Sequence, residues 1–190
     1  MPGARTHDAL TLATGVALIP TVWAVLPDHN IAAAVTVASA HIISGLAFSP
    51  DLDLDSEPYR RWGPLRLLWY PYREAIGHRS WISHSLVVGP LLRLLYFLLM
   101  TALLMATLVL LLGVIRPVDG RALLAALGAS LGALWMDHRA HIIYFLLGFI
   151  SGGAVHTAAD WLTTRPDPHH GAIFKRRRAR RRRRNEWGIF

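Results

Sequence analysis

The sequence contains one run of 22 consecutive residues, 94 to 115, in which no side chain is charged. Only Tyr96, Thr101, Thr107 and Gly113 interrupt its apolar side chains. A helix of about 20 apolar residues is long enough to cross the hydrocarbon core of a bilayer. The run therefore predicts a transmembrane helix. The composition agrees, because 53% of the chain is hydrophobic and 17% is charged, whereas about a quarter of a soluble domain is charged.

Three further apolar segments resemble membrane helices. Residues 9–26 and 31–48 are separated by the turn-forming sequence PDHN and predict a helical hairpin. Residues 142–159 form the last uncharged run, and residues 122–136 are apolar but only 15 long, which is short for a full crossing. We therefore expect an all-α fold, a multi-pass membrane helical bundle of about four transmembrane helices. A short interfacial helix over 122–136 and a long polar loop over 49–85 complete it.

The distribution of arginine predicts the topology. Arg5, the arginines of the 49–85 loop and the arginine-rich C-terminal segment contrast with the turn over 27–30, which has neither lysine nor arginine. Because short cytoplasmic loops are enriched in these residues, both termini are expected in the cytoplasm and the number of crossings is even. This parity places residues 122–136 at the far interface or in a re-entrant segment. Ala38-Ser39-Ala40 mimics a signal-peptide cleavage site, but two apolar runs precede it, which favours an uncleaved first helix.

A ten-residue segment near the C-terminus carries the excess positive charge. The formal net charge is +8, and residues 175–184 alone contribute nine positive charges. We therefore divide the chain into a membrane-embedded helical domain, 1–164, and a polybasic cytoplasmic tail, 165–190. Because the tail follows a membrane helix, it is expected to anchor the topology or to bind anionic lipid, in preference to nucleic acid.

Histidine is abundant and cysteine is absent, with ten and zero residues respectively. Disulfide scaffolds and thiolate metal sites are excluded, so a metal ion would need nitrogen and oxygen ligands. His156 and Asp160 in HTAAD are spaced i, i+4, which places both on one helical face where they could share a cation. Gly148 and Gly152 occupy the same stripe. A packing seam that ends in a histidine bonded to its own carboxylate explains the motif equally well.

The motif SPDLDLD follows the second apolar run. An extended backbone would place Asp51, Asp53 and Asp55 on one side of the segment, and a cation would relieve the repulsion between their carboxylates. The alternative is a solvated loop that Arg60 and Arg61 neutralise. For this segment the metal interpretation is favoured.

Further histidines lie near the ends of the predicted helices. In HRSWISHS, His78 and His84 are six residues apart, so we expect one in the loop and the other in the first turn of the third helix. Ser80 or Ser83 could cap that turn. His7 begins the first helix. In the four-span topology these three histidines, the HTAAD pair and the SPDLDLD aspartates all lie at one membrane face, which supports a site there.

The remaining histidines have weaker assignments. His41 lies inside the second apolar run, where it is either an additional ligand, as Asp55 could be, or a hydrogen-bond partner of a neighbouring helix. The pairs His138/His141 and His169/His170 lie in short polar segments and are expected in loops.

The segment RRWGPLRLLWYPYRE, residues 60–74, mixes four arginines with Trp62, Trp69, Tyr70 and Tyr72. This composition suits a belt at the level of the lipid headgroups. A grip on a lipid phosphate is the second interpretation, for which the candidate contacts are Arg60, Arg61, Arg73 and Arg79.

These motifs together resemble those of a bacterial family of uncharacterised metal-binding membrane proteins. That family is similar in turn to predicted membrane-bound, metal-dependent hydrolases that share a histidine near the N-terminus, PDxD, HRxxxH and HxxxD. The resemblance covers residues 4–93 and 148–164, and leaves the middle helix and the arginine-rich tail outside. It implies a location in the bacterial inner (cytoplasmic) membrane and a set of metal ligands: His7, Asp51, Asp53, His78, His84, His156 and Asp160.

Two classes of function remain open. The first is a metal-dependent hydrolase that acts at the cytoplasmic membrane surface on a phosphoester or ester such as a lipid headgroup. The second is a non-catalytic protein stapled by metal, whose tail binds anionic lipid or a partner. The cofactor expected is one or two divalent ions, with zinc preferred and manganese or iron as alternatives. Metal transport is disfavoured because the third helix has only isolated threonines. Metal-free lipid phosphatases of the phosphatidic-acid type are excluded, because their Ser-Arg and PSGH elements are missing.

Overall fold

The computed structural model describes residues 3–76, 82–116 and 119–163, and these residues contain helices and no strand. The expected all-α fold is therefore confirmed. Four helices are long and apolar enough to cross a membrane. In chain order the helices, including the two 3₁₀ helices η1 and η2, are α1 (Ala4–Val25), α2 (Ile31–Ala47), η1 (Pro50–Asp53), α3 (Glu57–Arg61), η2 (Gly63–Trp69), α4 (Tyr70–Ala75), α5 (Val88–Ile115) and α6 (Gly120–Thr163).

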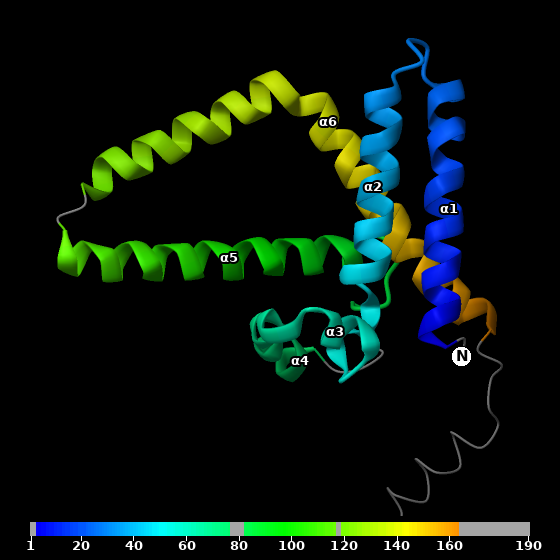
Figure 1. Cartoon of the computed structure of the whole chain (residues 1–190), viewed down its shortest axis with the longest axis horizontal. Helices are drawn as coiled ribbons and strands as arrows, with labels where there is room; N and C mark the ends of the chain where they lie inside the picture. The colour runs from blue at the N-terminus through cyan, green and yellow to red at the C-terminus, as the bar shows by residue number, and fades with distance from the viewer. Residues whose placement is uncertain (1–2, 77–81, 117–118, 164–190) are drawn as a thin grey trace, which may run out of the picture.

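Helices α1 and α2 form the predicted hairpin and lie side by side (Figure 1). Helix α1 ends at Val25, two residues before Pro27, which disfavours a helical conformation in the residue before it. The side chain of Asn30 then begins α2, because its oxygen accepts a hydrogen bond from the backbone N–H of Ala33 at 3.0 Å. The turn chemistry of the sequence thus fixes the hairpin.

The second half of α6 packs closely against α2. A Cβ atom added at Gly148 would collide with the carbonyl oxygen of Val37, and one added at Gly152 would collide with that of His41. On the α2 side, the small side chain of Ser44 also lies against Gly152 and is fully buried. Small residues of this kind let two helix backbones approach closely enough for extensive van der Waals contact. The structure therefore shows the close approach of a neighbouring helix that we expected at Gly148 and Gly152.

The 44 residues of α6 are two helical stretches that meet at a kink at His138. The prediction of a separate helix over 122–136 is therefore supported, whereas the predicted loop around His138 and His141 is wrong. His138 has non-helical backbone angles (φ −126°, ψ 15°) and kinks the helix, but both His138 and His141 lie within it, exposed. No proline or glycine lies between Asp137 and His141. The polar segment therefore joins the two helical stretches through a kink and not through a loop.

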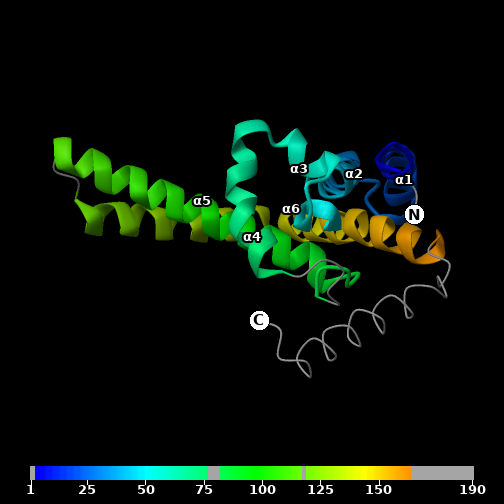
Figure 2. The same ribbon diagram turned by 90° about the horizontal axis from the view of Figure 1, so that it is seen from below.

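Residues 94–116 and 119–137, which we call the arm, differ from the expected bundle. Helix α5 runs crosswise to α1 and α2, which Figure 1 shows from the side and Figure 2 from below. The buried residues of α5 are confined to its first two turns. Large apolar side chains along the arm are exposed, among them Leu110 at 73%, Val114 at 86% and Leu124 at 71%. Among the described residues, the close bundle comprises α1, α2 and the second half of α6.

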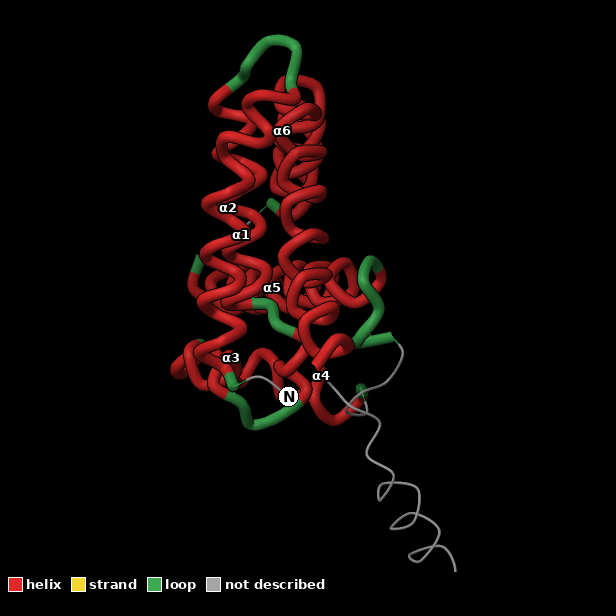
Figure 3. The backbone as a smooth tube through the Cα atoms, turned by 90° about the vertical axis from the view of Figure 1, so that its right-hand side faces the viewer, coloured by secondary structure: helices red, strands yellow, loops and turns green. Residues whose placement is uncertain are grey.

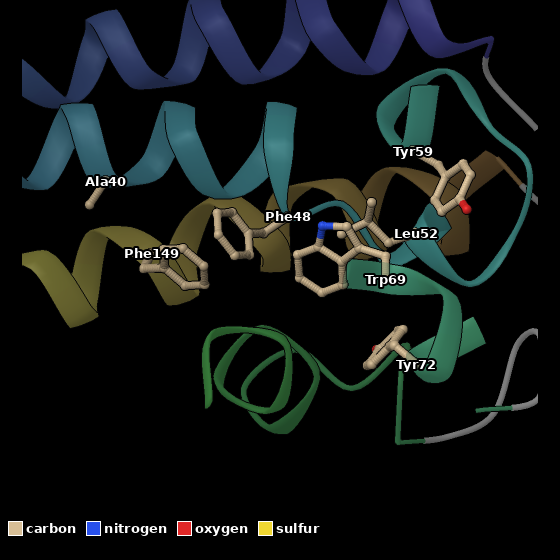
Figure 4. Packing of buried hydrophobic residues seen from close by; sticks show 7 residues of the cluster. All are labelled: Ala40, Phe48, Leu52, Tyr59, Trp69, Tyr72 and Phe149. Carbon is tan, nitrogen blue, oxygen red and sulfur yellow. The ribbon is translucent and has the colours of Figure 1, made fainter. Parts of the chain in front are cut away.

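The segment from Pro50 to Ala75 is helical in short pieces, so the expectation of an open loop over 49–85 is wrong for this part. An aromatic cluster holds it against the bundle (Figure 4). The Phe48 ring, at the end of α2, meets Trp69 of η2 edge-on at 5.5 Å and Phe149 of α6 at 5.1 Å. Trp69 and Tyr72, predicted in a headgroup belt, are almost fully buried. The burial of these two side chains holds the segment from Pro50 to Ala75 beside the C-terminal end of α2.

Candidate metal centre

Five side chains with nitrogen or carboxylate donors converge where α1 begins and where α2 and α6 end, at the opposite end of the molecule from the α1–α2 turn (Figure 3). They come from four segments that are distant in the sequence. His7 belongs to the second turn of α1, Asp51 to η1, and His84 to the turn before α5. His156 and Asp160 lie near the C-terminal end of α6, one helical turn apart.

His7, His156 and Asp160 form what we call the inner triad. Each offers a donor atom within 4.8 Å of the others. His7 Nε2 lies 3.1 Å from Asp160 Oδ1, and His156 Nε2 lies 3.7 Å from Asp160 Oδ2. The two imidazole rings stack with 3.9 Å between their centroids. All three side chains are buried, so this triad is closed to solvent.

Asp51, His84 and Asp160 form the outer triad, whose donor atoms also lie within 4.8 Å of one another. Asp51 and His84 are half-buried, in contrast to the inner triad. The two triads are connected twice. Asp160 belongs to both, and Asp51 Oδ2 lies 3.5 Å from His156 Nε2. The site is therefore one continuous cluster with a buried side and an open side.

Two serines that the sequence analysis did not assign to the site support its histidines. Ser49 Oγ lies 3.4 Å from both ring nitrogens of His156, and Ser83 Oγ lies 2.9 Å from Nδ1 of His84. Both serines are fully buried. Hydrogen bonds of this kind orient an imidazole that binds a metal and fix its tautomer. For Ser83 the sequence offered a signal, because this serine directly precedes His84.

The turn that carries His84 differs from the prediction. We expected His84 in the first turn of the third helix, but α5 begins only at Val88. The predicted cap by Ser80 or Ser83 is not seen either, because Ser83 contacts His84, while Ser85 Oγ accepts the hydrogen bond from the Gly89 N–H at 3.0 Å. Ser80 lies outside the described residues.

Arg93 is the main residue that the sequence analysis missed. It is fully buried, and its Nη1 donates a hydrogen bond to the carbonyl oxygen of Ser83 at 2.9 Å, which holds the turn that carries His84. The Asp53 carboxylate stabilises its charge. Burial raises the pKa of the neighbouring Tyr72 hydroxyl, and Arg93 opposes part of that rise. A lone arginine directly before the uncharged run was the available signal.

The three aspartates of SPDLDLD have different surroundings, because the extended backbone that would have placed them together is not formed. Residues 50–53 form a 3₁₀ helix, begun by Pro50 and capped by Ser49. Asp51 consequently joins the metal-ligand cluster. Asp53 is buried near Arg93 and belongs to neither triad. Asp55 is exposed, and its Oδ1 accepts a hydrogen bond from Nε of Arg60 at 3.2 Å.

His41 links three helices and belongs to neither triad. Its Nε2 lies 2.8 Å from Oγ1 of Thr14 on α1, and its Nδ1 lies 2.8 Å from Oγ of Ser151 on α6. The side chain is 1% exposed. The structure thus shows the interhelical hydrogen bonding that we had kept as the alternative to metal binding.

The candidate arginines for lipid contact have protein partners. Besides Arg60, Arg61 forms two hydrogen bonds with the Asp8 carboxylate, one of them from Nη1 to Oδ1 at 2.9 Å. These bonds raise the pKa of the Arg61 guanidinium and fasten α3 to the beginning of α1. Arg73 lies over the Tyr59 ring at 4.6 Å. His78, Arg79, His169, His170 and the arginine-rich segment lie outside the described residues.

The donor set of the cluster suits a divalent metal ion. Three imidazoles and two carboxylates are the nitrogen and oxygen ligands that zinc, manganese and iron accept. Nδ1 of His7 is buried without a hydrogen-bond partner among the described residues. A buried polar atom of this kind is costly unless it is satisfied, and a bound cation would order the surrounding imidazoles and carboxylates.

Comparison with known proteins gives the same assignment. The model of a family described as uncharacterized metal-binding proteins (DUF2227) matches residues 2–169. The match includes the middle helix, which we had placed outside the resemblance, and ends before the arginine-rich segment. An uncharacterized protein of Aquifex aeolicus (strain VF5) is 39% identical over 57 residues, which cover 30% of this chain and 40% of that relative. No solved structure matches. The chain belongs to this family of uncharacterized metal-binding proteins.

Proposed function

We propose that the chain is a metal-dependent hydrolase of the bacterial inner membrane that acts on a phosphoester or ester, such as a lipid headgroup, at the cytoplasmic surface. The difference in burial between the two triads carries this proposal. The inner triad is closed, whereas in the outer triad the side chain of Asp51 is 30% exposed. A structural metal site fills every coordination position with protein, but a catalytic site keeps one open for water or substrate.

The parts of the site have distinct tasks in this proposal. A bound divalent cation would supply Lewis-acid polarisation of the scissile ester and would acidify a water molecule. The inner triad fixes the cation from the protein side. The outer triad provides the solvent-facing edge where a substrate can approach, and Ser49 and Ser83 hold the imidazoles in their orientations.

The membrane location rests on the apolar surface. The arm exposes leucine, valine and isoleucine over most of its length, which water does not tolerate over so large an area. The second half of α6 runs parallel to α2, from the turn end of the hairpin to the site end, because Gly148 lies at Val37 and Gly152 at His41. The arm therefore carries the chain between the two ends of the hairpin, which is consistent with an even number of crossings. Arginines of α3 and α4 share the end that holds the site (Figure 3).

The test begins with metal content. Wild-type protein purified in detergent without chelator is compared by inductively coupled plasma mass spectrometry with the double variant His156→Ala/Asp160→Ala. The matched control is His138→Ala/His141→Ala, which removes two exposed histidines of the same helix. We expect zinc, manganese or iron in the wild type and in the control, and none in the first variant.

The same samples are then assayed for hydrolysis of bis-(p-nitrophenyl) phosphate, p-nitrophenyl acetate and phospholipid vesicles. Activity that is present in the wild type and the control, and lost with the metal, supports the proposal. Retention of a full metal complement without hydrolysis of any of these probes contradicts it. That result would favour the alternative, a protein whose cation staples residues 49–53 to the end of α6.

A further inference from the structure

We infer that the centre holds two divalent cations, one in each triad, with the carboxylate of Asp160 bridging them. The inference deepens the proposed function, since it rests on the same cluster being the metal site. It concerns the number of ions and the role of one carboxylate, neither of which follows from metal binding alone.

The number of donors is the first argument. Five side chains offer ligand atoms at the site, which exceeds the four positions of a tetrahedral zinc ion. When the donors are grouped by distance, they separate into two sets of three that have only Asp160 in common. Three protein ligands with one further position for water is the usual composition of a catalytic zinc site. The half-buried outer triad matches this composition, and the inner triad supplies three protein ligands in a closed environment.

The position of Asp160 is the second argument. Its two oxygens face the two imidazoles of the inner triad, with Oδ1 at 3.1 Å from Nε2 of His7 and Oδ2 at 3.7 Å from Nε2 of His156. The same carboxylate also has an oxygen within 4.8 Å of donor atoms of Asp51 and His84 in the outer triad. Asp160 is 6% exposed, so its carboxylate is held inside the cluster between the closed and the open side. In two-metal sites the ions lie about 3.5–4 Å apart, a separation that the two oxygens of one carboxylate can span.

The third argument is the second connection between the triads. Asp51 Oδ2 lies 3.5 Å from Nε2 of His156, so a ligand of the outer triad reaches a ligand of the inner one. Asp51 therefore has donor atoms near the imidazoles of both sets, His156 in the inner triad and His84 in the outer one. With both ions bound, the outer one faces solvent and the inner one is enclosed, which predicts unequal exchange rates for the two.

The experiment counts the ions and their coupling in the full chain. Detergent-purified protein is stripped with chelator, dialysed and titrated with Mn²⁺, while electron paramagnetic resonance measures free Mn²⁺ and detects a spin-coupled pair. We expect two equivalents with a coupled signal for the wild type and for the control His141→Ala. His84→Ala is expected to retain one equivalent without coupling. Asp160→Asn is expected to lose the coupled signal, and circular dichroism checks that each variant keeps its helices.

One equivalent in the wild type, or two coupled equivalents in His84→Ala, would overturn the inference. The outcome is separable from that of the proposed hydrolase. Two coupled ions without hydrolysis would leave the dinuclear centre standing and contradict the enzyme. A single ion with metal-dependent hydrolysis would support the enzyme and contradict the dinuclear centre.

Discussion

The end of the molecule that holds the site and the arm are both built from helices apolar enough to cross a membrane, yet they use their side chains differently. Half of the apolar window of α2 is buried inside the protein, whereas none of that of α5 is. At the site end, small residues bring α2 and α6 together, and histidines, aspartates and serines fill the interior. In the arm, leucines face outward. An apolar composition therefore indicates that a helix can lie in a membrane. It does not indicate whether that helix packs in the protein core.

Helix α6 contains the same motif in both regions. Gly128 and Gly132 repeat the four-residue spacing of Gly148 and Gly152. A Cβ atom at either glycine of the first pair would meet nothing within 4 Å, while at the second pair it would collide with the backbone of α2. The GxxxG pattern thus predicts a close helix contact correctly at Gly148 and Gly152. At Gly128 and Gly132 the same pattern has no neighbour within 4 Å among the described residues.

The largest effect is expected from Gly152→Leu. The added side chain has no space beside the His41 carbonyl, so α2 and α6 must separate, and the free energy of unfolding should fall by at least about 3 kcal/mol. Unfolding in detergent mixed with sodium dodecyl sulfate, followed by circular dichroism, measures the change. Gly128→Leu is the matched control and is expected to leave stability unchanged or slightly raised. Equal losses in both variants would show that the arm packs as tightly as the site end.

The next effect concerns the buried arginine. Arg93→Met removes the hydrogen bond to the Ser83 carbonyl and leaves the Asp53 carboxylate without its positive neighbour. We expect a loss of about 3 kcal/mol in stability together with a loss of bound metal, because the turn that carries His84 is released.

Arg121→Met at the exposed beginning of α6 tests the same substitution in the arm. It is expected to change the free energy of unfolding by less than about 0.5 kcal/mol, with full metal content by mass spectrometry. Full metal binding in Arg93→Met would contradict the role assigned to that residue.

The smallest effect compares two threonines. Thr14 and Thr107 each donate to a backbone carbonyl of their own helix, and only Thr14 also contacts a histidine of another helix. Thr14→Val is expected to cost about 0.6 kcal/mol, the typical strength of an interhelical hydrogen bond in a membrane protein, and Thr107→Val nothing measurable. Identical unfolding curves for Thr14→Val and the wild type would mean that the contact between Thr14 and His41 does not stabilise the bundle.

The position of the helices was largely predictable. Apolar runs and the turn-forming residues 27–30 located α1, α2, α5 and the second half of α6 to within a few residues at most ends. The prediction of a loop failed at residues 137–141, where a polar segment is helical. The polar residues 137–141 suggested a loop, but none of them is a strong helix breaker, so two helical stretches meet there directly at a kink at His138.

The sequence predicted which types of residue form the candidate site. It predicted less well which individual residues join the site. The spacing of His156 and Asp160 already placed them on one face, since an α-helix repeats every 3.6 residues. The separation of Asp51 from Asp53 and Asp55 was not readable, because it depends on whether residues 50–53 are extended or form a 3₁₀ helix. Arg93 escaped notice because its partners, Ser83 and Asp53, become neighbours only after folding.

The sequence by itself determined that this chain is helical, apolar enough for a membrane, and equipped with nitrogen and oxygen donors near the ends of its helices. These properties depend on composition and on contacts between residues close in the chain. Only the tertiary structure decided which donors meet. His7 and Asp160 are separated by most of the described chain, yet they lie 3.1 Å apart, because the close packing of Gly148 and Gly152 on α2 aligns the end of α6 with the beginning of α1.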